Sequence, residues 1–193
     1  MIAGRGRQDF SFVKNWAKEN PRLFYHILDA LTHVTTEYLI KQVDAGACAV
    51  QLFDTWAGFL SVEDYNALAK PYTDAILARL KQDNVPSIHF VRNGGHLLDE
   101  MLTLSSDVVS IGNDVKLCDV YEKMCGKQQA VQGNLKPEIL LIDKKTIKEE
   151  TQKMFSCVPD PCQGYIVNLS HGVLPETPVE NVKWFVECAK NLG

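Results

Sequence analysis

The sequence has no apolar run that could cross a membrane and no strong excess of charge of one sign. A membrane span needs roughly 18 consecutive apolar residues, and the formal net charge is only −4 over 193 residues. Residues 1–9 also lack the apolar core, roughly 7–15 residues long, of a secretory signal. We therefore expect a cytoplasmic protein that has neither nucleic acid nor a membrane among its partners.

The sequence has no Cys-x-x-Cys pair, and several motifs that bind cofactors are missing. Six cysteines are scattered along the chain, and Cys157 and Cys162 are separated by VPDP, which is too wide for a redox or zinc Cys-x-x-Cys pair. We expect reduced, mostly buried thiols. The sequence also has no Gly-x-Gly-x-x-Gly turn, no phosphate loop and no nucleophile elbow. These absences predict a site with no cofactor and no metal.

Short apolar runs alternate with segments of helical periodicity. The runs have little alternation, which is typical of parallel strands covered on both faces; they are 47–53, 86–91, 107–111, 129–132 and 164–169. Helical spacing predicts helices over 21–44, 61–82, 119–124, 142–155 and 178–191. Ser61 and Asp64 have the spacing of a capping box at the start of the second of these helices.

This order predicts an α/β protein with a parallel sheet. Two intervals between strands are only about 20 residues long, which favours a barrel over a doubly wound sheet. A (β/α)8 barrel has about 250 residues and eight strands, whereas we find five strands in 193 residues. Either the chain is a piece of something longer, or another copy supplies the missing wall.

Polar side chains gather where the five strands end, and ligands of parallel α/β folds bind at that edge. Glycines beside them allow close backbone approach to a ligand. The polar residues are Asp54, Thr55, His89, Arg92, Asn113, Asp114, Gln132, Asn134, Asn168, Ser170 and His171. Trp56 and Phe59 could form an apolar wall beside them. The gathering of these side chains predicts the site more strongly than any one residue does.

Among the five histidines, His171 has the position best suited to function. It follows a strand end and precedes a glycine in a loop, where binding and catalytic residues concentrate. We expect His89 to be a hydrogen-bonded core histidine and His96 to be a cap or packing residue. His26 and His33 are expected on a solvated helix face. Thr55 is the second favoured site residue, although it could simply cap a turn.

Four ordered motifs resemble the uroporphyrinogen decarboxylase family. The family's Gly-Ala-Asp-Ala-Val-Gln-Ile-Phe-Asp-Ser-Trp-Ala-Gly is similar to "GACAVQLFDTWAG", and its Ile-His-Phe strand and Gly-His turn to "IHFVRNGGHLL". Its Val-Gln-Gly-Asn-Leu-Asp-Pro resembles "VQGNLKP", and its Asn-Leu-Gly-His-Gly-Ile-Leu-Pro-Glu-Thr-Pro resembles "NLSHGVLPETP". The resemblance covers essentially all 193 residues.

The resemblance implies a cofactor-free (β/α)8 barrel, of which this chain has about the last five strands and their helices. The chain would then be a single domain, residues 1–193, that is incomplete at its N-terminus. The family generally forms homodimers, and it removes CO2 from the acetate side chains of uroporphyrinogen III to give coproporphyrinogen III for haem synthesis. His171 matches the family's active-site histidine, and Thr55 stands where the family has a site serine. Both are expected to bind substrate and to act in catalysis.

Some positions differ from the family pattern. The family's catalytic aspartate and carboxylate-binding arginines lie in an N-terminal half that has no counterpart here, and its site tyrosine precedes Met1. Its Glu-Gly-Gly-Gly loop reads AGRG at 3–6, and its Gly-Leu-Asp-Trp strand end reads SIGN at 110–113. Two alternatives therefore stay open. The chain could be an inactive or split-gene fragment that binds porphyrinogen or a complementary half-barrel, or a zinc or corrinoid methyltransferase of the same superfamily.

Overall fold

A computed structural model of the chain describes residues 11–159 and 164–192. The strands are β1 (Val50–Phe53), β2 (Ser87–Phe90), β3 (Val108–Ser110), β4 (Ala130–Leu135) and β5 (Tyr165–Leu169). The α-helices are α1 (Ser11–Glu19), α2 (Pro21–Asp44), α3 (Val62–Leu68), α4 (Lys70–Gln82), α5 (Leu98–Met101), α6 (Leu117–Lys123), α7 (Lys144–Phe155) and α8 (Val179–Lys190). Short 3-10 helices cover Ala57–Phe59, Gly95–Leu97 and Pro137–Leu141. The Arg-containing loop at 3–6 and Cys162 lie outside the described residues.

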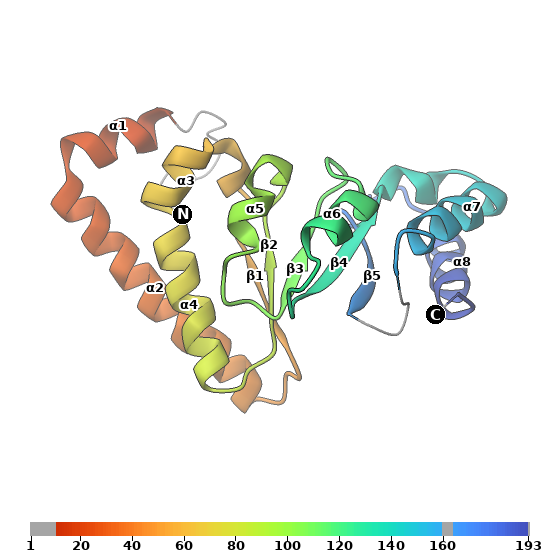
Figure 1. Cartoon of the computed structure of the whole chain (residues 1–193), viewed down its shortest axis with the longest axis horizontal. Coiled ribbons are helices and arrows are strands. Elements are labelled where there is room, and N and C mark those ends of the chain that lie inside the picture. The colour runs from red at the N-terminus through yellow and green to blue at the C-terminus, as the bar shows by residue number, and fades with distance from the viewer. Residues whose placement is uncertain (1–10, 160–163, 193) are drawn as a thin grey trace.

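The five strands form one parallel sheet in which the spatial order equals the chain order, β1-β2-β3-β4-β5. Figure 1 shows this progression, with α1 and α2 at one end of the molecule and α7 and α8 at the other. A doubly wound sheet reverses its order at a switch point, whereas a barrel adds each strand beside the preceding one. The predicted α/β fold class is confirmed, and the strand order is that of a TIM-type barrel.

Each predicted strand is present within a few residues, and α2 has the predicted bounds. The predicted single helix over 61–82 is wrong in one respect, because it divides into α3 and α4 at Ala69. Pro71 causes the division, since proline has no N–H to donate and its ring clashes with the carbonyl four residues earlier. The Ser61 half of the predicted capping box is confirmed, because Ser61 Oγ accepts a hydrogen bond from the Asp64 N–H at 3.1 Å.

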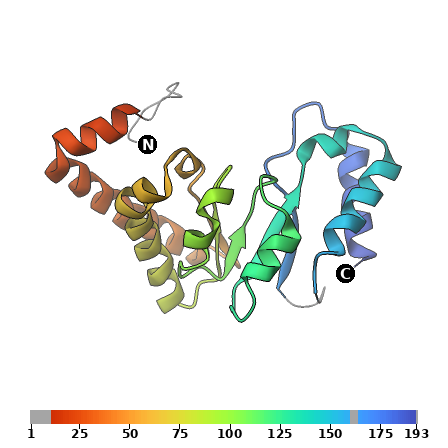
Figure 2. The ribbon, with the colours of Figure 1, turned by 45° about the horizontal axis from the view of Figure 1, so that its top comes forward.

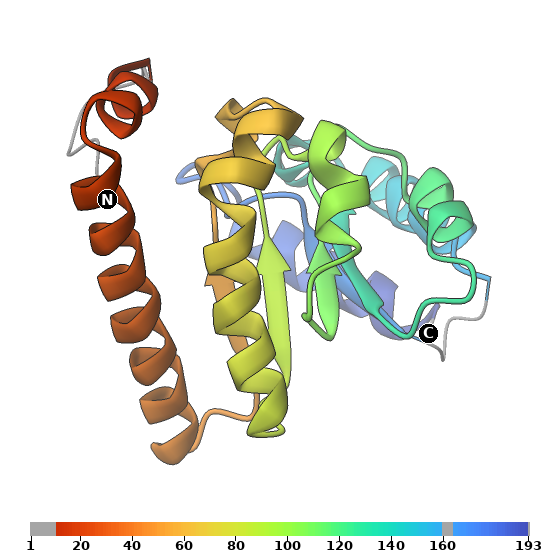
Figure 3. The same ribbon diagram turned by 60° about the vertical axis from the view of Figure 1, so that its left-hand side comes forward.

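The helices pack on one face of the sheet and bury its apolar side chains. Val109 and Val131 are adjacent in the strand register, and both are fully buried against the helices. Helices α7 and α8 lie side by side beyond β5 (Figure 2). At the other end, α2 packs along α4 and forms the outer edge of the molecule (Figure 3). None of the helices in the described ranges is long and apolar enough to span a membrane.

The cysteines differ from the sequence-based expectation. Cys118 in α6 and Cys157 just after α7 form a disulfide, with their Cα atoms 4.6 Å apart. Cys48 and Cys125 are exposed free thiols, and only Cys188 is a buried one. The expectation of reduced, mostly buried thiols is therefore wrong for four of the described cysteines. Cys118 and Cys157 are 39 residues apart in the sequence, and this separation gave no sign of the disulfide, because helix packing brings the two segments together.

Candidate active site

A pocket of about 370 Å³ opens at the carboxyl ends of the strands, on the face of the sheet opposite the helices. Its lining comes mainly from β1, β5 and the loops that follow them. The lining residues are Gln51, Phe53, Thr55, Phe90, Ser110, Asn168, Leu169, Ser170, His171 and Gly172. β1 and β5 are the two edges of the sheet, so the sheet must curve for both to line one pocket.

The curvature is also visible in a hydrogen bond across the inner face. Gln132 Nε2 on β4 donates to Gln51 Oε1 on β1 at 3.3 Å, although β2 and β3 lie between these strands in the sheet. Gln132 Nε2 also donates to Ser110 Oγ on β3 at 3.0 Å. Inward-pointing side chains of a closed barrel meet in the same way. This network forms the floor of the pocket.

The two favoured site residues, Thr55 and His171, line the same pocket. They are 116 positions apart in the sequence, and they meet because one follows the first strand and the other follows the last. Thr55 is half-buried, whereas the His171 side chain is exposed at the pocket mouth. The prediction that the strand ends bring them together agrees with the geometry, while their chemical roles stay predictions.

Asn168 and Ser170 extend the polar lining on β5. The Leu169 N–H donates to Asn168 Oδ1 at 2.8 Å. Ser170 is buried and its backbone N–H donates to the Leu135 carbonyl at 2.8 Å, which fixes the strand end against β4. Successive side chains of a strand alternate between its faces, so residues 168 and 170 face the pocket and Leu169 packs mainly in the core.

The apolar wall of the pocket differs from the one that the sequence suggested. Phe53 and Phe90 line the pocket and contact each other edge to face, with ring centroids 6.0 Å apart. The Phe53 side chain is 65% exposed. Trp56 and Phe59 stack on each other at 5.9 Å, but they are not among the residues that line this pocket. A period-2 count back from Thr55 would have pointed to Phe53 and Gln51.

Several of the predicted polar rim residues instead stabilise the scaffold. Asp54 accepts a hydrogen bond from Thr73 Oγ1 at 3.2 Å, and burial of its carboxyl group raises the pKa of Asp54. Asn134 Nδ2 donates to the carbonyls of Gly112 and Val115 at 2.9 Å each. Asp114 accepts the N–H of Gly95 at 2.7 Å. The expected cluster is therefore divided between the pocket and the loops around it.

His89 lies in the core as predicted, but the predicted hydrogen bond is absent. Its side chain is fully buried, and within residues 11–159 and 164–192 neither Nδ1 nor Nε2 has a hydrogen-bond partner. Burial lowers the pKa of His89 to about 4, so the ring is neutral at pH 7. It is next to Val109 in the register and does not line the pocket.

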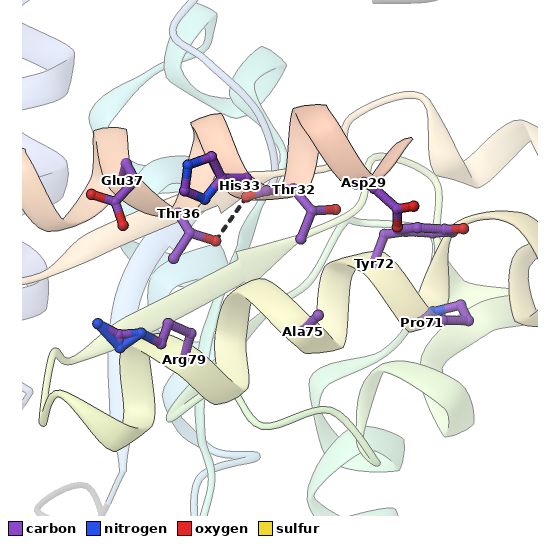
Figure 4. A pocket seen from close by; sticks show the side chains of 9 residues that line it. All are labelled: Asp29, Thr32, His33, Thr36, Glu37, Pro71, Tyr72, Ala75 and Arg79. Carbon is purple, nitrogen blue, oxygen red and sulfur yellow. Dashed lines mark hydrogen bonds between the residues drawn. The ribbon is translucent and has the colours of Figure 1, made fainter. Parts of the chain in front are cut away.

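The other histidines are structural or solvent-facing. The ring Nε2 of His96 lies 2.9 Å from the Leu60 carbonyl oxygen, which agrees with a packing role. His26 and His33 are exposed on α2, as expected. His33 lines an open groove of about 560 Å³ between α2 and α4, together with Asp29, Glu37 and Arg79 (Figure 4). This groove lies on the helix layer and holds none of the favoured site residues.

Among the described residues, no group of three or more His, Cys, Asp or Glu side chains is placed to hold a metal ion.

Comparisons with known proteins agree on the family and the fold. The family model described as "Uroporphyrinogen decarboxylase (URO-D)" matches residues 1–192. Among curated relatives, "Uroporphyrinogen decarboxylase" of Geobacter sulfurreducens is 36% identical over 193 residues, which are 100% of this chain and 56% of the relative. The protein of the same name from Nostoc punctiforme is 37% identical over 194 residues, which are 54% of its length. The chain thus spans about half the length of these relatives.

Among solved structures, a methyltransferase from Methanosarcina mazei superposes with a TM-score of 0.81 at 20% sequence identity. The superposition covers 92% of this chain and 52% of the methyltransferase. At this identity the likeness concerns the fold alone.

Proposed function

The chain belongs to the uroporphyrinogen decarboxylase family, and on this premise we propose that it carries part of a uroporphyrinogen decarboxylase site. The reaction is the cofactor-free removal of CO2 from the acetate side chains of uroporphyrinogen III, giving coproporphyrinogen III. The observation that carries the proposal is the pocket lined by both Thr55 and His171 at the carboxyl ends of the strands. The relatives named uroporphyrinogen decarboxylase support this choice of reaction.

The chemistry needs an electron sink and a source of protons. Once the neighbouring pyrrole is protonated, the bond between the acetate CH2 and its carboxylate carbon breaks, and its electron pair moves into the ring. CO2 leaves, a proton converts the exocyclic CH2 to a methyl group, and the ring gives up its own added proton. One proton is consumed for each CO2 released. The protein contributes mainly by placing charges and hydrogen-bond donors beforehand.

His171 and Thr55 have the chemistry for two parts of this task. Imidazole exchanges protons near neutral pH, and His171 is exposed at the pocket mouth, where a substrate carboxylate can reach it. In this proposal His171 pairs with a carboxylate or delivers the proton to the exocyclic CH2. Thr55 donates its hydroxyl hydrogen to a carboxylate oxygen, as a serine at that position would.

Complementation tests the proposal. The purified chain is mixed with the part of the Geobacter sulfurreducens relative that it does not match, and coproporphyrinogen is measured from uroporphyrinogen. We expect product in the mixture, a rate within about 2-fold for Thr55→Ser and at least about 10-fold lower for Thr55→Val, because a hydrogen bond to a charged group contributes about 1.5–3 kcal/mol. No product from a mixture shown to form a complex, or an unchanged rate for Thr55→Val, would contradict the proposal.

A second candidate is a non-catalytic role in which the chain binds porphyrinogen or a complementary half-barrel. The described strands β1 and β5 each pair with one neighbour only, and Phe53 and Ile166 expose apolar side chains on the sheet. Exposed strand edges and apolar surface favour pairing with another segment. This candidate predicts a complex of the two parts by light scattering but no coproporphyrinogen from it.

A third candidate is a zinc or corrinoid methyltransferase of the same superfamily; the methyltransferase from Methanosarcina mazei shares the fold, and this likeness does not extend to the reaction. Such a site needs a His-x-Cys on the strand where this chain has His89-Phe90-Val91, so a valine stands at the position of the cysteine ligand. Zinc at one equivalent per chain in elemental analysis would favour this candidate over the decarboxylase.

We further propose that residues 1–193 act as a single domain, that the working protein is a cytoplasmic homodimer, and that it needs neither a membrane nor nucleic acid. Its family membership supports these proposals. Light scattering of the complemented protein tests the dimer.

A further inference from the structure

We infer that the floor of the pocket is a carboxylate subsite made of neutral hydrogen-bond donors from Gln51, Ser110 and Asn168. The inference deepens the proposed function, on which it rests for the identity of the whole ligand. The subsite itself is argued only from the hydrogen bonds, burial and charge of its residues.

Gln132 sets the direction of the hydrogen bonds in the pocket floor. Its side chain is 4% exposed, and its Nε2 group donates to both Gln51 Oε1 and Ser110 Oγ. The Gln51 amide oxygen therefore already accepts a hydrogen bond, whereas the Gln51 Nε2 group remains available as a donor to a ligand. A hydroxyl that already accepts a hydrogen bond can still donate its own hydrogen, so Ser110 also presents a donor.

Asn168 is oriented in the same sense by the backbone. The Leu169 N–H donates to Asn168 Oδ1 at 2.8 Å, and because a backbone N–H can only donate, the amide orientation is fixed. The Asn168 Nδ2 group remains available on the pocket side. None of the hydrogen bonds between described residues uses the Gln51 or Asn168 amide nitrogen as a donor. Three side chains in one pocket thus offer donors, and the oxygen of each already accepts one hydrogen bond.

The pocket has donors but no lysine, arginine, aspartate or glutamate among its lining residues. An anion with several acceptor lone pairs satisfies such a site, whereas a cation would leave the donors unpaired at a desolvation cost. A carboxylate has about four acceptor positions and matches three or more donors. The Phe53 and Phe90 rings beside the floor offer apolar surface to the body of a ligand, and hydrogen bonds to a charged acceptor are stronger than those to a neutral one. The ligand class is therefore an organic carboxylate with an apolar body.

Two of the hydroxyls differ from the family motifs quoted in the sequence analysis. Ser110 and Ser170 stand where the family motifs have glycine, in Gly-Leu-Asp-Trp and Asn-Leu-Gly-His, and both line the pocket. Ser110 is 2% exposed and bonded to Gln132, so its hydroxyl is held in place. These side chains add donors and narrow the floor. We expect this chain to bind one carboxylate more tightly than it would with glycine at positions 110 and 170.

The test uses the chain itself, labelled with 15N, and the side-chain NH2 signals of Gln51 and Asn168. Sodium acetate is titrated against sodium chloride at equal ionic strength. We expect saturable shifts of both signals with acetate only. Gln51→Glu, which places a like charge on the floor, should weaken acetate binding at least 10-fold, and Ser110→Gly about 3-fold. Gln152→Glu on the exposed face of α7 is the matched charge control and should stay within 2-fold.

Equal shifts with chloride, or equal affinities for Gln51→Glu and Gln152→Glu, would overturn the subsite. Should Gln51→Glu fail to fold by circular dichroism, Ser110→Gly and Asn168→Leu carry the test, and unchanged acetate affinity in both would overturn it.

Further titrations separate the source of the carboxylate from the proposed reaction. Uroporphyrin that displaces acetate, with no displacement by its octamethyl ester, identifies a macrocycle carboxylate as the ligand, while acetate binding without displacement identifies a small free carboxylate. Acetate binding together with no decarboxylation in the complemented mixture supports the subsite and rejects the proposed function. Decarboxylation that Gln51→Glu leaves unchanged rejects the subsite and keeps the proposed function.

Discussion

Buried polar side chains differ in their hydrogen bonding between the two faces of the sheet. On the helix-facing side, His89 is fully buried with both ring nitrogens unpaired within the described residues. On the pocket side, Gln132 is 4% exposed and has partners on two other strands. Successive side chains of a strand point to opposite faces of the sheet. One position along a strand therefore places a side chain in the packed core, and the next position places it on the face of the hydrogen-bonded network. The difference indicates that the helix-facing side provides stability and the pocket side provides binding.

Truncating one apolar side chain on each side should give the largest contrast. Ile147 on α7 is fully buried in the core between sheet and helices, whereas Phe53 is 65% exposed on the pocket side. We expect Ile147→Ala to lower the free energy of unfolding by about 2–5 kcal/mol because it leaves a cavity, and Phe53→Ala by less than about 1 kcal/mol. Urea denaturation measures both. Similar losses would remove the distinction between the faces.

Reducing the disulfide tests the helix layer independently. The Cys118–Cys157 bond joins α6 to the segment after α7, and its loss should destabilise the fold by about 2–4 kcal/mol. Urea denaturation with and without dithiothreitol, or of Cys118→Ser with Cys157→Ser, measures the change. Cys48→Ser removes an exposed free thiol and should have no effect. Six free thiols in the denatured, unreduced protein would contradict the expectation.

Acid should destabilise the fold through His89. Its pKa is about 4 in the folded state and 6.5 as a model value, so between these pH values the unfolded chain binds more protons than the folded one. Stability therefore falls as the pH drops from 6.5 toward 4, by up to about 3 kcal/mol. His89→Leu should remove this part of the pH dependence and raise stability at pH 7. Equal slopes for the two proteins in denaturation at several pH values would count against this account of His89.

The smallest expected change in the free energy of unfolding comes from the hydrogen-bond network of Gln132, Gln51 and Ser110. Gln132→Leu removes the donor to Gln51 and Ser110, and we expect a loss of about 1–2 kcal/mol, because both partners line the pocket and can bond to water. The same substitution should free the Gln51 amide to rotate, so its NH2 signals should shift without any ligand. A loss as large as that of Ile147→Ala would show that the pocket side also carries the fold.

The sequence predicted the elements better than their side-chain directions. Continuous apolar runs predicted each of the five strands and their parallel order, because strands buried on both faces need such runs. The prediction of a single helix over 61–82 failed because it overlooked Pro71, although a proline is a helix-breaking signal that the sequence displays. The disulfide and the bond from Gln132 to Gln51 could not be predicted, since each depends on how distant segments pack.

For the candidate site, the positions of Thr55 and His171 at strand ends were sufficient to select them. The predicted set of polar rim residues was too large, because Asp54 and Asn134 form hydrogen bonds with the scaffold. Gln51, Phe53 and Ser110 were missed although the two-residue period of a strand places them on the face of the pocket. Their importance follows from the curvature of the sheet, which no local pattern encodes.

The most direct test of the account compares His171→Ala and His89→Leu in the complemented decarboxylation assay. Each variant removes one histidine, at the pocket mouth in one case and on the helix-facing side in the other. The account predicts that His171→Ala forms coproporphyrinogen at least about 100-fold more slowly, as expected for loss of a group in proton transfer, while His89→Leu stays within about 3-fold of the parent. A rate that His171→Ala leaves unchanged, or that His89→Leu lowers as much, would contradict it.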